Sequence, residues 1–259
     1  MIRYYESNSI MHRVLLGPDE NLSENSPNLN LVTAILVSEG QDYWFDHVEI
    51  FNTDDDAFGI GNYSDKAAIN VSVTHYKVYS ASKGLLVAQD QAEGQEAERV
   101  GRVTIAWSDF GAKCRNFRVS GGQVVHGFNN YAHDFGNDTC GTVAGHGSAA
   151  NRDGRMTPIL LSESSVFDDN NNGLAGLLQG PSELLGLPVQ GYVFTDGQNE
   201  FLGNGTTNNF VFGPEDNNNR GLEHPEMPYS YRKIPTQDVR GYVISNAGVD
   251  GENIVTPTE

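Results

Sequence analysis

The apolar residues of this chain form short runs rich in β-branched residues, and clusters of Gly, Asn and Asp separate these runs. Such runs are typical of β-strands bounded by turns. The pattern predicts strand segments at 32–37, 43–51, 69–79, 84–88, 102–110, 124–132, 158–167 and 191–196. No stretch of ordinary helix length keeps a 3.6-residue period, apart from a brief possibility at 173–186. The chain is therefore predicted to be all-β.

Similar segments recur along the chain. Each has a β-branched strand, a polar or His/Ser position, then an aromatic residue and a turn, as in VSVTHYKVY and VTIAWSDFG. Val48, Thr74 and Ile105 mark three such segments at intervals of 26 and 31 residues, and stacked repeats are roughly 20–45 residues long. The recurrence favours a right-handed parallel β-helix. A jelly roll or another sandwich is the alternative, but it would more often show tight two-residue hairpins.

Composition narrows the choice of partners. The chain has 259 residues, 38% of them hydrophobic, and a net charge of −18. No basic run offers an electrostatic footprint for phosphates, so nucleic acid is an unexpected partner. The first residues, MIRYYESNSIMHRVLLG, form neither a signal peptide nor a membrane span. We expect one domain over 1–259, with a short N-terminal part at 1–30 and a closing segment at about 222–259.

Several motifs, in this order, resemble the pectate lyases of the pectate lyase/pectin lyase superfamily. They are YWFDHVEIF (43–51), DDDAFGIG (54–61), INVSVTHYKVYSASKGLLVA (69–88), RVTIAWSDFGAKCRNFR (102–118), VVHGFNNY (124–131) and PYSYRKIPTQDVRGYVISNAGV (228–249). The resemblance covers about residues 31–249. It implies a right-handed parallel β-helix that cleaves α-1,4-polygalacturonate by β-elimination, with polygalacturonate or pectin as the partner.

The resemblance also implies site residues. Lys83 matches the family's lysine that contacts the substrate carboxylate, and a cation there acidifies the C5 proton and stabilises enolate-like charge. Arg115 matches the arginine that takes this proton. Arg118 is a second candidate for that role, or a uronate-binding group. Asp46 and His47 match positions that are structural in the family, where they pack and hydrogen-bond within the coil, and we interpret His126 in the same way.

The resemblance also implies a calcium site at the DDD turn, but the chain departs from the family's ligand pattern. The family takes acidic ligands from three positions, which fall here on Thr33, Asp55 and Gly59. Calcium normally takes six to eight oxygen ligands. Asp54 and Asp56 are possible replacements, although neighbouring strand residues point to opposite faces, and Glu39 is a further candidate. Three interpretations stay open: calcium held near Asp55 and Asp56, a solvated acidic turn, or a site that substrate carboxylates complete.

Further departures keep alternative functions open. Phe117 replaces an expected Pro and Ser120 stands at an expected Arg, and the part before the first motif is short. An uncapped end of a β-helix exposes strand edges, which suggests a partner copy and a homo-oligomer. The alternatives are a calcium-independent pectin lyase, a lyase for another uronate polymer such as alginate, and a non-catalytic carbohydrate-binding β-helix of a phage tail or adhesion module. Absence of a signal sequence agrees with release by lysis, a non-classical route or a phage origin.

Overall fold

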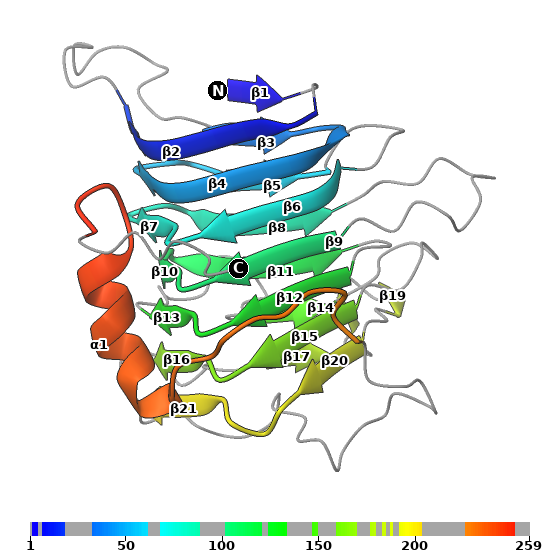
Figure 1. The fold of residues 1–259 in the computed structure, drawn as a ribbon, viewed down its shortest axis with the longest axis vertical. Helices are drawn as coiled ribbons and strands as arrows, with labels where there is room; N and C mark the ends of the chain where they lie inside the picture. Colours follow the sequence, from blue (N-terminus) through cyan, green and yellow to red (C-terminus); the bar gives the residue numbers. More distant parts are fainter. Residues whose placement is uncertain are drawn as a thin grey trace.

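The computed structural model describes residues 2–4, 7–18, 33–61, 68–88, 102–120, 124–133, 147–149, 159–169, 177–179, 183–184, 187–188, 192–203 and 226–251. In this part of the chain nearly every strand pairs in parallel with the equivalent strand of the next coil. The coils are stacked along the long axis of the molecule (Figure 1). The predicted right-handed parallel β-helix is confirmed, with one α-helix added to it.

The first sheet contains one strand from each of seven coils and runs along one side of the stack. In spatial order its strands are β1 (Ile2–Tyr4), β3 (Ile35–Val37), β5 (Asp56–Ile60), β8 (Lys83–Ala88), β11 (Cys114–Ser120), β14 (Gly147–Ala149) and β17 (Leu177–Gln179). Leu85 of β8 pairs with Phe58 on one side and Phe117 on the other, so residues of one row repeat from coil to coil.

The second sheet is bent into two arms that meet in the long strand β4 (Gly40–Phe51), which belongs to both. The front arm also contains β2 (Ser9–Leu16), β6 (Ala68–Thr74), β9 (Arg102–Ala106), β12 (Val124–Phe128), β15 (Ile159–Glu163) and β20 (Tyr192–Thr195). The side arm contains β7 (Lys77–Tyr79), β10 (Asp109–Gly111), β13 (Tyr131–His133), β16 (Val166–Asp169) and β21 (Glu200–Gly203). A short antiparallel pair, β18 (Glu183–Leu184) and β19 (Leu187–Pro188), stands apart from both sheets.

The corner between the two arms repeats a left-handed backbone conformation. His47, His75, Trp107, Asn129 and Ser164 all have φ between 45° and 53°, a region that non-glycine residues rarely occupy. Consecutive corner residues stack: the rings of His47 and His75 are 4.4 Å apart, and those of His75 and Trp107 are 5.4 Å apart. This stacking helps to offset the cost of the unusual backbone conformation.

The interior of the coils holds one continuous hydrophobic core. Because side chains alternate along a strand, the front arm sends one set inward, including Phe45, Val73, Ile105 and Val125, all nearly inaccessible to solvent. Each fully buried side chain of this size contributes about 1.5–3 kcal/mol relative to an exposed one. The alternate residues point outward and form the surface on which the C-terminal residues lie.

Residues 226–251, hereafter the C-terminal strap, run back along the outside of the coils. The first part crosses the front arm, and α1 (Thr236–Asn246) then lies along the side arm (Figure 1). Val239 and Val243, one turn apart on α1, are buried against Tyr131 and Val166. The strap is the described part of the predicted closing segment.

Several sequence expectations need correction. The pattern did not predict α1, because Gly241 interrupts it and only a narrow face is buried. It also omitted several strands, among them β2 and β11, whose apolar runs contain charged residues. The brief helical possibility at 173–186 is wrong where the structure describes it, since 177–179 and 183–184 are strands. The coil repeat aligns Thr74 with Asp46 and Ala106, rather than with Val48 and Ile105.

The expectation of one domain over 1–259 stays a prediction. Within the described residues, no helix is both long enough and apolar enough to cross a membrane.

Candidate functional site

The predicted substrate lysine lies at the start of β8, in a row that crosses the first sheet. Lys83 pairs with Asp56 of β5 on one side and with Cys114 of β11 on the other. Neighbouring strands lie about 4.8 Å apart, so Arg115, the residue after Cys114, is next to the Lys83 row. For Arg115 only the main chain is described. The two predicted catalytic residues thus come from the same end of adjacent strands.

A β-bulge in β11 separates this row from the regular part of the sheet. Cys114 pairs with Lys83 and Phe117 pairs with Leu85, so β11 uses one residue more than β8 over the same distance. A bulge redirects the side chains around it, and bulges are common beside active sites. Arg115 is one of the two residues inside this bulge.

The other bulge residue, Asn116, is fully buried and fixed by hydrogen bonds. Its Oδ1 accepts a bond of 2.9 Å from the main-chain N–H of Ala112. The main-chain oxygen of Asn116 lies only 2.3 Å from the point where a Cβ on Gly84 would be. A glycine is therefore required directly after Lys83 for the bulge to pack as it does.

Lys83 forms an ion pair with Asp55, the middle aspartate of the DDD turn. Both side chains are partly exposed. Asp56 is buried, and burial of Tyr76 together with the negative charge of Asp56 raises the pKa of this core tyrosine. The two carboxylates expected to hold calcium thus have different surroundings: Asp55 is partly exposed and paired with Lys83, whereas Asp56 is buried near Tyr76.

The family position Gly59 and the further candidate Glu39 do not supply the missing ligands, and the family position Thr33 carries no carboxylate. Gly59 has no side-chain oxygen, and the residues that pair with it on the two neighbouring strands, Leu36 and Leu86, are apolar. Glu39 follows the carboxyl end of β3, whereas Asp56 is at the amino end of the neighbouring β5. Four residues of strand span roughly 13 Å, so Glu39 is too far away to join Asp55. The described residues alone do not fit a calcium ion, and calcium stays a prediction.

Arg118 lies three residues beyond Arg115 on the same strand. It pairs with Leu86 of β8 and is 8% exposed. Leu86 in turn pairs with Gly59. Three residues of strand span roughly 10 Å, so the main chain of Arg118 is farther from the Lys83 row than that of Arg115. This spacing favours Arg115 for chemistry beside Lys83 and Arg118 for a neighbouring contact.

A second cluster of polar residues surrounds Asp46 on the outer side of the front arm. Oδ1 of Asp46 accepts hydrogen bonds from Thr74 (2.7 Å) and His75 (3.0 Å). Oδ2 accepts bonds from Nδ1 of His47 (2.8 Å) and Nδ1 of His12 (3.1 Å). Burial by itself raises the pKa of Asp46, but the bonds from His47, His75 and Thr74 outweigh it and hold that pKa far below its usual range.

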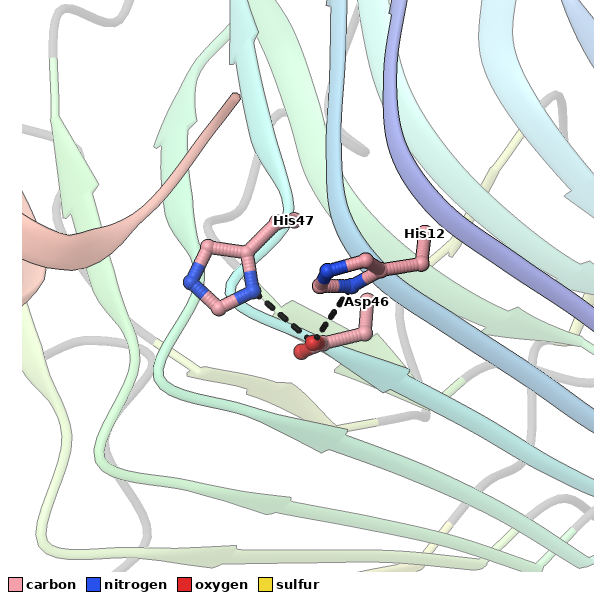
Figure 2. A group of neighbouring side chains, drawn as sticks. All are labelled: His12, Asp46 and His47. Atoms are coloured by element: carbon pink, nitrogen blue, oxygen red, sulfur yellow. Dashed lines mark hydrogen bonds and ion pairs between the residues drawn. The ribbon is translucent and has the colours of Figure 1, made fainter. Parts of the chain in front are cut away.

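His12, Asp46 and His47 are also the only group in the described ranges whose ligand atoms, within 4.8 Å of one another, could meet on a metal ion. Figure 2 shows both imidazoles directed at the same carboxylate oxygen. A metal on Nδ1 of His47 would move the proton to Nε2, which is buried without a hydrogen-bond partner. An unsatisfied buried N–H costs about 1–3 kcal/mol. The cluster therefore favours hydrogen bonding between coils, and the expected packing role of Asp46 and His47 is confirmed.

The strap is fastened to the front arm through a third set of charges. Lys233 donates to Glu163 (3.1 Å) and to Asp196 (2.7 Å), and Tyr231 donates to Glu163 (2.6 Å). His126 lies beneath, with Nε2 2.8 Å from Glu163. Burial opposes ionisation of both acids, but these donors lower the pKa values of Glu163 and Asp196, which in turn raise that of Lys233 despite its own burial.

The far end of the strap is held by Arg13 in β2. Its guanidinium donates to the carbonyl oxygens of Val249 (3.0 Å) and Gly251 (2.7 Å). The strap thus ties coils at both ends of the stack to each other. Sequence reasoning missed Arg13, Glu163 and Lys233, because their partners are distant in the chain and no local pattern marks them.

Comparison with solved structures places this fold among the pectate lyases. A pectate lyase from Bacillus sp. N165 in complex with trigalacturonate matches with a TM-score of 0.56 and 18% identity, over 95% of this chain and 69% of the other. A thermostable pectate lyase matches with 0.53 and 11%, over 96% and 64%. A pectate lyase bound to a hexasaccharide matches with 0.52 and 12%, over 97% and 64%.

The chain spans about two thirds of the length of these solved structures. No family model matches it, and none of the curated proteins does. At these identities the likeness shows the architecture and leaves the reaction to be argued from the site. The chain is a pectate lyase-like parallel β-helix.

Proposed function

We propose that the chain is a polysaccharide lyase that cleaves α-1,4-polygalacturonate by β-elimination, at the row of the first sheet that contains Lys83 and Arg115. The observation that carries this proposal is the register of β8 and β11. It brings a lysine and an arginine to the same end of adjacent strands, with the arginine in a bulge. The solved structures of the same fold include two bound to a saccharide, one of them trigalacturonate.

The chemistry assigns a separate task to each cation. The ammonium group of Lys83 pairs with the uronate carboxylate and stabilises the negative charge that develops when C5 loses its proton. Arg115, as the neutral guanidine, takes this proton. The electron pair of the C5–H bond forms the C4–C5 double bond, the C4–O4 bond breaks, and the departing oxygen takes a proton from water.

An arginine base demands alkaline conditions. Guanidinium has a pKa above about 12 in water, and neighbouring positive charge lowers the pKa of a cationic group. Lys83 supplies such a charge one strand away. We therefore expect turnover to rise with pH over the alkaline range, and Arg118 to contribute to binding of an adjacent uronate.

The test is a turnover assay with purified protein and polygalacturonate, which follows the ultraviolet absorbance of the unsaturated product. Lys83→Ala and Arg115→Ala should each lower turnover at least about 100-fold, the usual size of a lost general base. Lys113→Ala is the matched control, because it removes an exposed cation close to Arg115 in the sequence. Its turnover should stay within about twofold of the unchanged protein.

Parallel substrates separate the alternatives. Turnover on highly methylated pectin alone would identify a pectin lyase instead. Turnover on alginate alone would identify a lyase for another uronate polymer. Absence of product on all three, with retained binding of polygalacturonate to the Arg115→Ala variant, would identify a non-catalytic carbohydrate-binding β-helix.

A further inference from the structure

A pocket of about 640 Å³ lies on the outer side of the front arm, between its strands and the strap. Small-molecule sites commonly have volumes of about 300–1,000 Å³. None of its described lining residues belongs to the first sheet, so it is separate from the Lys83 row. We call it the aromatic pocket. Its principal lining residues are Trp44, Trp107, Phe128, Tyr229, Tyr231 and Arg232.

The two indoles of the pocket are held in fixed orientations. Trp107 stacks on His75 at 5.4 Å and meets Phe128 edge-on at 5.2 Å. Trp44 donates from Nε1 to Oγ1 of Thr74 at 2.9 Å. Both tryptophans are nevertheless only partly buried. Rigid aromatic faces that remain accessible are suited to a ligand with an apolar face, such as the C–H face of a pyranose ring.

The tyrosines come from the strap and close the pocket from the other side. The hydroxyl of Tyr229 lies 2.7 Å from Oγ1 of Thr104 and 2.7 Å from Nδ1 of His126. Tyr231 is anchored on Glu163, as described above. Both rings are therefore positioned before any ligand arrives, which lowers the entropic cost of binding.

The pocket offers one guanidinium to an acidic ligand. Its charged lining residues are Asp46 and Arg232. The carboxylate of Asp46 already accepts four hydrogen bonds. Arg232 is exposed and makes neither an ion pair nor a hydrogen bond within the described parts of the chain. A guanidinium is well matched to a carboxylate, which it binds through two parallel hydrogen bonds.

We propose that the aromatic pocket binds one or two uronate residues of an acidic saccharide, as a second binding site separate from the Lys83 row. The sugar rings stack on the aromatic faces, and the carboxylate pairs with Arg232. Such a site on another face of the coils would hold a polysaccharide chain near the enzyme. The choice of galacturonate as the probe rests on the proposed function. Recognition of an acidic sugar by aromatic rings and one guanidinium does not.

The pocket carries its own spectroscopic reporter, because the only two tryptophans of the chain both line it. The experiment is a titration of intrinsic tryptophan fluorescence with digalacturonate, in the Lys83→Ala variant so that no turnover interferes. We expect a saturable change. Arg232→Ala should weaken binding at least about tenfold, while Arg102→Ala, which removes an exposed arginine of the front arm outside the pocket, should leave it unchanged.

The fully methylated ester of digalacturonate is the matched ligand without charge, and it should bind at least about tenfold more weakly. The proposal is overturned by the absence of a saturable change, by equal binding in Arg232→Ala, or by equal binding of the ester. Turnover of polygalacturonate reports on the Lys83 row alone, so failure of either proposal is recognised independently of the other.

Discussion

The ammonium group of Lys83 is paired with the carboxylate of Asp55, so the cation proposed to receive the substrate already has an anionic partner. A uronate carboxylate must compete with Asp55 or share Lys83 with it. Asp55 is also the residue that best matches the family's calcium ligands. The effect of substituting Asp55 therefore distinguishes an ion pair with Lys83 from a ligand that holds an essential cation.

Asp55→Asn should strengthen substrate binding. Exposed ion pairs contribute up to about 1 kcal/mol, so release of Lys83 should lower KM for polygalacturonate up to about fivefold, with kcat nearly unchanged. Steady-state kinetics on the ultraviolet assay measures both constants. Asp54→Asn, which changes the exposed neighbour, is the control. Complete loss of turnover in Asp55→Asn would instead show that Asp55 holds an essential cation.

If the DDD turn is a solvated acidic turn, removal of divalent metal should leave turnover unchanged. The described residues do not assemble a calcium site around Asp55, and Lys83 already supplies a cation in this row. The measurement is turnover before and after dialysis against EDTA, followed by addition of calcium. Activity that disappears with EDTA and returns with calcium would contradict this expectation and favour a site completed by substrate carboxylates.

Gly84→Ala should reduce turnover although it removes no charged or polar side chain. A Cβ at this position would meet the main-chain oxygen of Asn116 at 2.3 Å, so β8 and the bulge that contains Arg115 must move apart. We expect a loss of at least about tenfold in kcat, since small displacements of catalytic groups are costly. Gly241→Ala is the control: no atom lies within 4 Å of its new Cβ, and the helix should gain about 0.5–1 kcal/mol.

Asp46→Asn should destabilise the fold by about 3 kcal/mol at pH 7. The carboxylate of Asp46 accepts hydrogen bonds from residues of several coils, and an amide replaces it with a weaker acceptor. The pKa of Asp46 is depressed in the folded state. Its stabilisation is therefore complete above the unfolded pKa of about 3.9 and is lost as pH falls further. Urea unfolding should show a constant difference between the two proteins above pH 5 and a shrinking one below pH 4. A difference independent of pH down to pH 2 would argue against this role.

Lys233→Met should detach the front part of the strap. It leaves Glu163 and Asp196 without their shared cation, and breaking such a pair costs about 3 kcal/mol. The raised pKa of Lys233 means that its contribution is present below about pH 10 and is lost at higher pH. The lowered pKa values of the two acids make their contribution disappear below about pH 4.

Urea unfolding and limited proteolysis of the strap measure this effect, with Lys113→Met as an exposed control. Detachment should also change tryptophan fluorescence, since strap residues line the same pocket as Trp44 and Trp107. Unchanged protease sensitivity of residues 226–235 would show that aromatic packing alone holds the strap.

The order of apolar and polar residues along the chain determined which segments form the strands of the coils. Alternation of apolar and polar residues in 43–51 and 69–79 is enough to predict strands, because one side of each strand must face the core. The order of the motifs determined which lysine and which arginine to consider. Lys83 and Arg115 were named from sequence, and strand pairing then placed them side by side.

Tertiary structure alone decided what those residues meet. Lys83 pairs with Asp55 across 28 positions, and Asp46 receives donors from coils 28 and 34 positions away. The aromatic pocket exists only because Tyr229, Tyr231 and Arg232 fold back over strands more than a hundred residues earlier. Strand formation depends on the alternation of neighbouring residues, which is written in the sequence. Charge pairing and pocket formation depend on which coils and strap residues are stacked together, and that is decided only when the whole chain packs.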